Sequence, residues 1–84
     1  MEMTKSEVVG ALRMCNPYTT DAELVIYASA FLEHRAAQAH IDQNGTILKH
    51  PKTEAPFENP YLSIRDRTAR VMLKLALKTG DLWR

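Results

Sequence analysis

The stretch from Asp21 to Gln43 constrains the fold of this chain more than any other segment does. It contains neither proline nor glycine, and its apolar side chains recur at steps of three and four residues, which places them on one face of a helix. Such a helix is about 30 Å long at 1.5 Å per residue. Because the whole chain has 84 residues, every other segment has to pack along this helix or extend from one of its ends.

Local signals define both ends of this long helix. Thr20 and Glu23 have the spacing of a capping box, in which a hydroxyl and a carboxylate satisfy free backbone amides of the first turn. Asn44 and Gly45 follow the last turn, and both accept the left-handed backbone angles with which many helices end. Alanines inside the helix leave room for a second helix to approach closely. These alanines are Ala28, Ala30, Ala36, Ala37 and Ala39.

A short helix is predicted before this one. Thr4 and Glu7 repeat the capping-box spacing, and a helix from about Lys5 to Met14 follows them. The next residues, 16–19, read Asn-Pro-Tyr-Thr and are typical of a turn. The chain therefore enters the long helix from a short, separate one.

A second long helix is predicted near the C-terminus. Asn59 suits an N-cap, and Pro60 suits the first helical position, where its missing N–H is not needed. The helical pattern runs to about Thr79, and Gly80 then ends the helix. The connector between the long helices, residues 46–58, contains two prolines and has no helical period, so it is extended. Within it, Ile47 and Leu48 can pair with residues 55–57 in a small hairpin.

These elements predict an all-α fold in one domain over residues 1–84. Residues 1–19 form the short helix and turn, and residues 20–84 form an antiparallel hairpin of the two long helices. One seam of the last helix has the spacing required to meet the first long helix. The seam contains Tyr61, Ile64, Thr68, Val71 and Leu75.

The last helix has more apolar surface than one partner helix can cover. Met72, Leu73, Ala76 and Leu77 lie outside the seam, and two interpretations remain open for them. The short N-terminal helix covers them, or they meet other subunits of an oligomer. The predicted oligomer or partner interface comprises Phe31, Val71, Met72, Leu73, Ala76, Leu77 and Trp83.

A basic stripe follows the same helix. Arg67, Arg70, Lys74 and Lys78 are spaced three, four and four residues apart, so they share one face. Such a line can contact DNA phosphates independently of base sequence. Basic side chains near a helix C-terminus also solubilise it and interact favourably with its dipole, and we favour this second interpretation from spacing alone.

The sequence contains no recognisable catalytic, cofactor or metal site. His34 and His40 are six residues apart and point to different sides of the helix, so they cannot ligate one metal ion from one face. We predict a protein that is not an enzyme and that needs no cofactor. An enzyme using His34 or His50 is the weakest of the hypotheses considered.

Composition limits the compartment and the partners. Eleven basic and ten acidic residues give a net charge of +1, so a nucleic-acid site must be local. Cys15 is the only cysteine, which excludes an internal disulfide and favours a reducing compartment. No segment has the length of an apolar membrane span or of a signal peptide. We therefore expect a cytoplasmic protein without membrane partners.

The order of these features resembles the small subunit of bacteriophage terminase. The resemblance covers residues 18–83: a Thr-Asp-Ala-Glu-started helix, Asn44-Gly45, a loop, Asn59-Pro60, and a helix ending Leu-Ala-Leu-Lys-Thr-Gly80. It implies a non-catalytic DNA-packaging factor in the bacterial host cytoplasm. Such a factor assembles into a ring-like homo-oligomer, binds double-stranded viral DNA, and recruits or regulates the large subunit that holds the ATPase and nuclease.

A second hypothesis comes from a different class of protein. A small helical adaptor would bind one protein partner through the surface from Met72 to Leu77. Trp83 could be an anchor in that interface, since tryptophan is enriched at binding hot spots. The alternative is that Trp83 covers the end of the helix.

Overall fold

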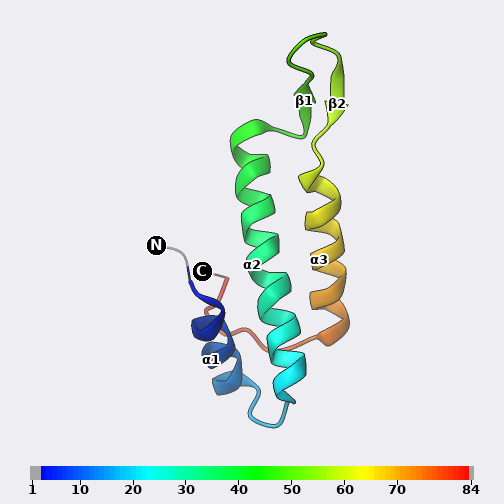
Figure 1. Cartoon of the computed structure of the whole chain (residues 1–84). Helices are drawn as coiled ribbons and strands as arrows, with labels where there is room; N and C mark the ends of the chain where they lie inside the picture. The colour runs from blue at the N-terminus through cyan, green and yellow to red at the C-terminus, as the bar shows by residue number, and fades with distance from the viewer. Residues whose placement is uncertain (1–2, 84) are drawn as a thin grey trace.

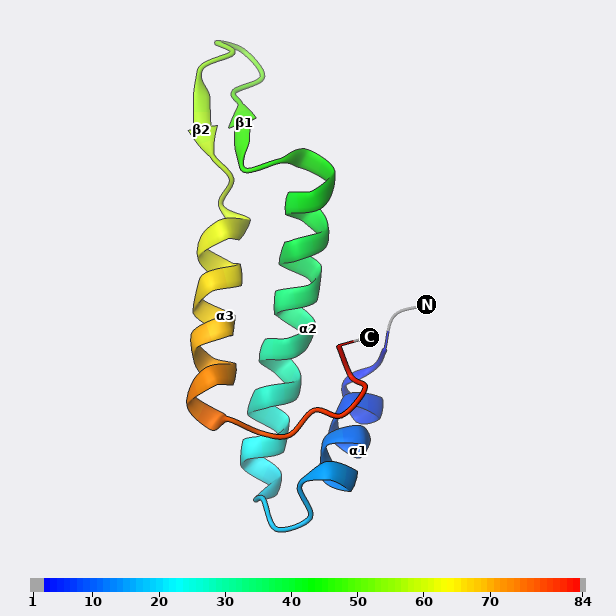
Figure 2. The same ribbon diagram turned by 180° about the vertical axis from the view of Figure 1, so that it is seen from behind.

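The computed structural model describes residues 3–83 and is mostly helical (Figure 1). Two long helices lie side by side and antiparallel, a small β-hairpin extends from one end of the pair, and a short helix packs near the other end (Figures 1 and 2). The elements are α1 (Lys5–Cys15), α2 (Asp21–Asn44), β1 (Ile47–Lys49), β2 (Pro56–Glu58) and α3 (Tyr61–Leu75). The helical hairpin with a short N-terminal helix is confirmed, but the fold is not purely all-α, because the connector forms a two-stranded sheet.

The helix starts follow the sequence signals closely. In α1, the amide of Glu7 donates to the hydroxyl of Thr4, and the amide of Thr4 donates to the Glu7 carboxylate, so the capping box is complete. In α2, the amide of Glu23 donates to the Thr20 hydroxyl at 3.3 Å, but within residues 3–83 the Glu23 carboxylate forms no return bond to the Thr20 amide, so the predicted capping box is only half formed. The end of α2 is also as predicted, since Gly45 has a positive φ of 83° and its amide donates to the carbonyl of Ile41.

The small hairpin suggested for the connector is confirmed, but its second strand is residues 56–58 instead of 55–57, so Ile47 pairs outside the predicted range. Strands β1 and β2 are antiparallel, with Leu48 opposite Phe57 and Ile47 opposite Glu58. Two-stranded sheets have little stability alone, and the side chains of this one are mostly exposed. Its position must therefore be set where it joins the helices.

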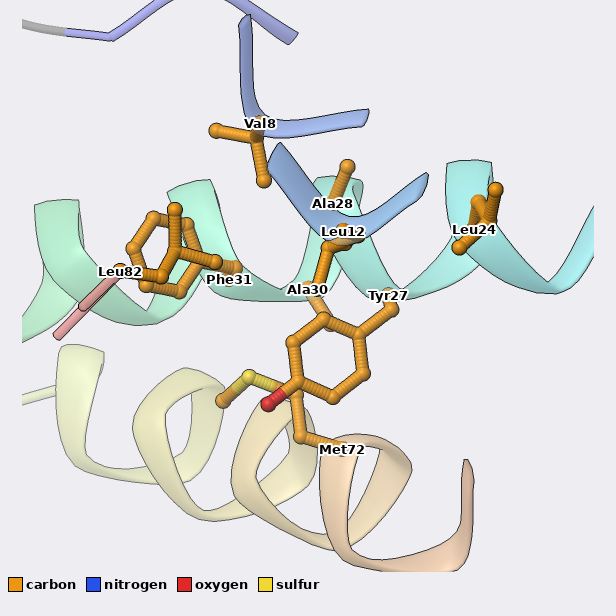
Figure 3. Packing of buried hydrophobic residues seen from close by; sticks show 9 residues of the cluster. All are labelled: Val8, Leu12, Leu24, Tyr27, Ala28, Ala30, Phe31, Met72 and Leu82. Carbon is orange, nitrogen blue, oxygen red and sulfur yellow. The ribbon is translucent and has the colours of Figure 1, made fainter. Parts of the chain in front are cut away.

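The apolar core lies where α1, the first half of α2 and the second half of α3 meet. Figure 3 shows α1 on one side of α2 and α3 on the other, with Tyr27 and Met72 between the two long helices. Phe31 is fully buried beside Leu82 from the C-terminal segment. The buried cluster comprises Val8, Leu12, Leu24, Tyr27, Ala28, Ala30, Phe31, Met72 and Leu82.

The predicted end of the last helix is wrong by about one turn. Helix α3 stops at Leu75, and Ala76 adopts left-handed angles with φ 50° and ψ 41°. Residues 76–83, which we call the C-terminal strap, then cross α2 toward α1 (Figures 1 and 2). The strap brings Leu82 into the core, and this burial is a tertiary effect that the helical pattern of the sequence does not contain.

None of the three helices resembles a membrane span. Within residues 3–83, no helix combines the length and the apolar character needed to cross a bilayer.

Candidate interaction surfaces

The predicted basic stripe is shorter than its spacing suggested. Arg67, Arg70 and Lys74 are exposed on α3. Lys78 is not on the helix: it lies in the strap, where its backbone N–H and C=O are both bonded to the side chain of Asn16. The prediction that four cations share one helical face is therefore wrong for Lys78, because the chain bends at Ala76.

The three remaining cations differ in their surroundings. The guanidinium of Arg67 lies 3.5 Å from the carboxylate of Glu33 on α2, so part of its charge is neutralised within the chain. Arg70 and Lys74 form no ion pair with any residue in the range 3–83. They are one turn apart on the exposed side of α3, and they are the cations of this stripe that are free to meet an anionic partner.

The predicted apolar interface divides into buried and exposed residues. Phe31 and Met72 belong to the core of the chain itself. Phe31 is fully buried, and Met72 is 7% exposed and reaches the surface only where it lines a groove. Val71 and Leu77 are half-buried against that core. Leu73, by contrast, is 79% exposed, and Trp83 is 47% exposed. Ala76 is exposed as well.

The exposed members of this set border an apolar groove between α2, α3 and the strap. Leu73 and Ala69 of α3 form one wall, and Trp83 of the strap forms another. Tyr27 and His34 of α2 also line the groove. It lies on a different flank of α3 from Arg67 and Lys74, because Ala69 and Leu73 are one turn apart and each lies at least about 100° around the helix from both cations. Helix α3 thus has an apolar flank and a basic flank.

His34 occupies an unusual place in this groove. Its ring meets the Trp83 ring edge to face, with centroids 5.5 Å apart, and its Nδ1 atom is buried without a hydrogen-bond partner among residues 3–83. Burial lowers the pKa of His34 below its ordinary value, the nearby Arg65 lowers this pKa further, and Asp66 raises it. The neutral imidazole is therefore favoured at neutral pH, as expected for a ring packed beside tryptophan.

Asn59 forms a polar junction at the opposite end of the hairpin. Its side-chain amide donates to the carbonyl of Gly45 at 2.9 Å and lies 3.2 Å from Nδ1 of His40, while its Oδ1 accepts from the amide of Tyr61. Its backbone N–H donates to Thr46. Asn59 is 1% exposed, so these bonds link the end of α2, the β-hairpin and the start of α3 without competition from water.

Sequence reasoning assigned Asn59 only a capping role. Helix α3 begins at Tyr61 with Pro60 as its N-cap, one residue later than predicted, although the side chain of Asn59 still accepts from the amide of Tyr61. The contacts with His40 and Gly45 were missed, because those residues are 19 and 14 positions away. The stacking of His40 on Tyr61, with ring centroids 4.1 Å apart, was missed for the same reason. A buried asparagine directly before a proline was the one local signal available.

Histidine and carboxylate side chains do not converge on a metal site in the described part of the chain. Within residues 3–83, no group of three or more His, Cys, Asp or Glu side chains is placed to hold a metal ion. His34, His40 and His50 lie respectively in the groove, at the Asn59 junction and in the exposed loop of the β-hairpin. The three histidines therefore lie in three separate parts of the fold.

The candidate surfaces are thus a basic flank and an apolar groove on one helix, with a polar junction that fixes the hairpin. Comparison of the chain with protein-family models, with curated proteins and with solved structures found no match in any of the three.

Proposed function

We propose that this protein is a non-catalytic DNA-packaging factor of the kind represented by the small subunits of bacteriophage terminases. It would assemble into a ring-like homo-oligomer in the bacterial host cytoplasm and bind double-stranded viral DNA. It would then recruit or regulate a large subunit with ATPase and nuclease activity. The resemblance depends on a set of turn residues that includes Gly45 and Asn59. These two residues are bonded to each other in the polar junction between α2, the β-hairpin and α3, and this observation carries the proposal.

The resemblance depends on Asn44-Gly45, the loop and Asn59-Pro60 in that order. Gly45 ends α2 with a positive φ, and its carbonyl accepts from the side chain of Asn59. Such turn signals are common one by one. Here they act together, since a single buried side chain joins both helices and the hairpin, and this supports a relationship extending over the whole architecture.

Self-assembly is supported by the apolar side chains that the fold leaves exposed. A chain of this size buries a limited fraction of its surface, so a further interface adds substantially to its stability. The groove beside Leu73 and Trp83 is one such surface, and Val25 and Ile26 on α2 form another exposed apolar pair. Contiguous apolar patches of this kind are typical of protein interfaces.

DNA binding is supported by the basic flank of α3. Arg70 and Lys74 are exposed and unpaired within residues 3–83, and Arg67 continues the line by one turn. Because the net charge of the chain is only +1, DNA would be attracted by this basic flank and not by the protein surface as a whole. In a ring, the same short flank would be repeated in every subunit, and its weak individual contacts would add.

The test combines native mass with DNA binding. We expect assemblies larger than a monomer, and binding to duplex DNA that weakens steeply with salt. Double charge reversal, Arg70→Glu with Lys74→Glu, should lower the affinity and reduce the salt slope by about one for each phosphate that is no longer bound. The control is the same reversal at Lys49 and Lys52, which are exposed on the β-hairpin.

Two outcomes would contradict the proposal. A strict monomer at high concentration would remove the ring, and a stable complex with one other protein in that case would favour the adaptor hypothesis. Equal salt slopes for the charge-reversed pair and the wild type would place DNA binding elsewhere or exclude it.

A further inference from the structure

The end of α3 has a conformation that its own sequence does not favour. Ala76 adopts a left-handed φ of 50°, which is unfavourable for any residue with a Cβ atom. The residues after it, Leu-Lys-Thr, can continue a helix, and Gly80 stands where such a helix would end naturally. Local preference therefore favours a straight continuation of α3 over residues 76–79, and the structure contains a bend.

The bend is held by three contacts of the strap. The side chain of Asn16 donates to the carbonyl of Lys78 at 2.7 Å and accepts from its amide at 3.0 Å. Leu82 is 7% exposed in the core. Trp83 meets Phe31 edge to face, with ring centroids 4.6 Å apart.

These contacts join the strap to α1 and α2 rather than to itself. Between residues 77 and 83, the backbone bond within the strap is the one from the amide of Leu82 to the carbonyl of Thr79. A segment with so little internal structure opens more easily than the helices do.

The straight alternative would have a different set of contacts. It would gain one helical turn and relieve Ala76, but the strap would no longer turn back across α2 (Figures 1 and 2). Leu82 and Trp83 would project beyond the end of the hairpin, and Phe31 would lose its cover. In the bent state, the strap covers the docking surface of its own chain. In the straight state, both the strap and this surface are exposed.

We propose that Ala76 is the hinge of a switch, and that in the straight state the strap docks onto α1 and α2 of a second copy. The occupant is identified by the contacts themselves, because Phe31 of any copy offers Trp83 the same ring contact, and Asn16 can still donate to the carbonyl of Lys78, which the last turn of a straight helix leaves free. The amide of Lys78 would instead bond within the helix, so the second Asn16 bond is not kept. Exchange of an identical element is a low-cost route to assembly. Docking of the strap onto a second copy rests on the self-assembly in the proposed function. The switch between the bent and straight states at Ala76 does not.

Two substitutions move the switch in opposite directions. Ala76→Gly suits the left-handed bend and weakens a continuous helix, so it favours the docked strap. Gly80→Ala does the reverse, because Gly80 has a φ of 55° in the bent state and an added Cβ would lie 3.2 Å from Sγ of Cys15. We expect each variant to change the ratio of the two states about fivefold.

Matched controls separate these effects from general helix propensity. Ala36→Gly makes the same change at an exposed position inside α2. Gly10→Ala makes the reverse change inside α1, where an added Cβ meets nothing within 4 Å.

The readouts are tryptophan emission, helicity and native mass. Trp83 is the only tryptophan of the chain, so its emission reports the strap alone. At low concentration, Gly80→Ala should shift the emission to the red and increase the helical circular dichroism signal, and Ala76→Gly should do the opposite. At high concentration, Gly80→Ala should increase the assembled fraction and return the emission toward that of the wild type, because Trp83 then packs on Phe31 of the second copy. Unchanged emission and helicity in Gly80→Ala at low concentration, or a red shift without added helix, would overturn the switch.

A cross-link distinguishes docking within a chain from docking between chains. In Gly80→Cys, the introduced thiol would lie beside Cys15, and mild oxidation would join the two. Exchange predicts cross-links between residue 80 of one chain and Cys15 of another at high concentration, which give dimers when two chains exchange straps and larger species when exchange runs around a ring. Oxidation of the wild type can give disulfide-linked dimers at most, because each chain has one cysteine. If the wild type assembles but Gly80→Cys gives monomeric cross-links only, self-assembly stands and the exchange is overturned; if every variant is monomeric, both fail.

Discussion

The two ends of the helical hairpin are held together by different forces. At the end where α1 and the strap meet α2, side chains from three helices and the strap bury one another in an apolar cluster. At the end where the β-hairpin begins, the buried centre is the polar side chain of Asn59, with Ile41 and Ala37 as the nearest buried apolar residues on α2. One end is an apolar core, and the other is a hydrogen-bonded junction.

This difference assigns different roles to the two ends. Burial of apolar surface is non-directional and stabilises any compact arrangement, whereas the bonds of Asn59 require His40, Gly45 and Tyr61 in fixed positions. We therefore expect the core end to supply most of the free energy of folding. The Asn59 end should fix the register of α2 against α3 and the direction of the β-hairpin.

The largest effect should come from the core. Phe31→Ala removes a fully buried ring that contacts Trp83, and such truncations lower the free energy of unfolding by about 3–5 kcal/mol. Urea denaturation followed by circular dichroism measures this loss. Met14→Ala is the control, because Met14 is 85% exposed on α1 and lies outside the groove, and it should change stability by less than about 0.5 kcal/mol. Equal losses for the two variants would contradict the placement of the core.

The polar junction should be the next most sensitive position. Asn59→Ala leaves the partly buried carbonyl of Gly45 and amide of Tyr61 without their partner, at a cost of roughly 1–2 kcal/mol. Asn44→Ala is the control, since Asn44 is exposed and its side chain makes one bond, to the carbonyl of His40.

Hydrogen exchange would locate the effect of Asn59→Ala. Loss of protection confined to residues 46–60 would fit a local junction. Loss spread evenly over α1 as well would show that the two ends are not independent.

The features that sequence predicted well depend on neighbouring residues. The capping box of Thr4 and Glu7 acts over three positions, and the turn at Gly45 depends on the freedom of glycine itself. The β-hairpin was suggested by the apolar residues on either side of the loop, and its pairing of Leu48 with Phe57 follows. Each of these elements forms where a short segment satisfies its own backbone.

The features that sequence missed depend on residues far along the chain. Helix α3 ends early because Asn16, 62 positions away, binds the backbone of Lys78. Met72 was assigned to a face outside the seam, but α2 covers it through Tyr27 (Figure 3). Spacing along one helix shows which residues share a face, and it does not show how many faces the rest of the chain covers.

The start of α1 offers a smaller test at the core end. Thr4→Ala removes the hydroxyl that accepts from the amide of Glu7 and should lower stability by about 1 kcal/mol. Ser6→Ala in the same turn is the control, because Ser6 is exposed and makes no side-chain hydrogen bond within residues 3–83. Thermal unfolding compares the two. If Thr4→Ala also shifts the emission of Trp83, α1 and the strap unfold together; if emission is unchanged, α1 frays alone.

The smallest expected effect is a pH dependence at His34, between the two ends. Burial and Arg65 lower the pKa of His34 in the folded state, so folding favours its neutral form. Its contribution to stability is present above the ordinary pKa of about 6.5, and it is lost as the pH falls through the lower folded pKa. The stability difference between wild type and His34→Gln should therefore shrink or reverse from pH 8 to pH 5 in urea titrations. His50→Gln controls for loss of an exposed imidazole. Because His34 packs on Trp83, acid should also shift Trp83 emission in the wild type and not in His34→Gln, and an equal shift in both would exclude His34 as the titrating group.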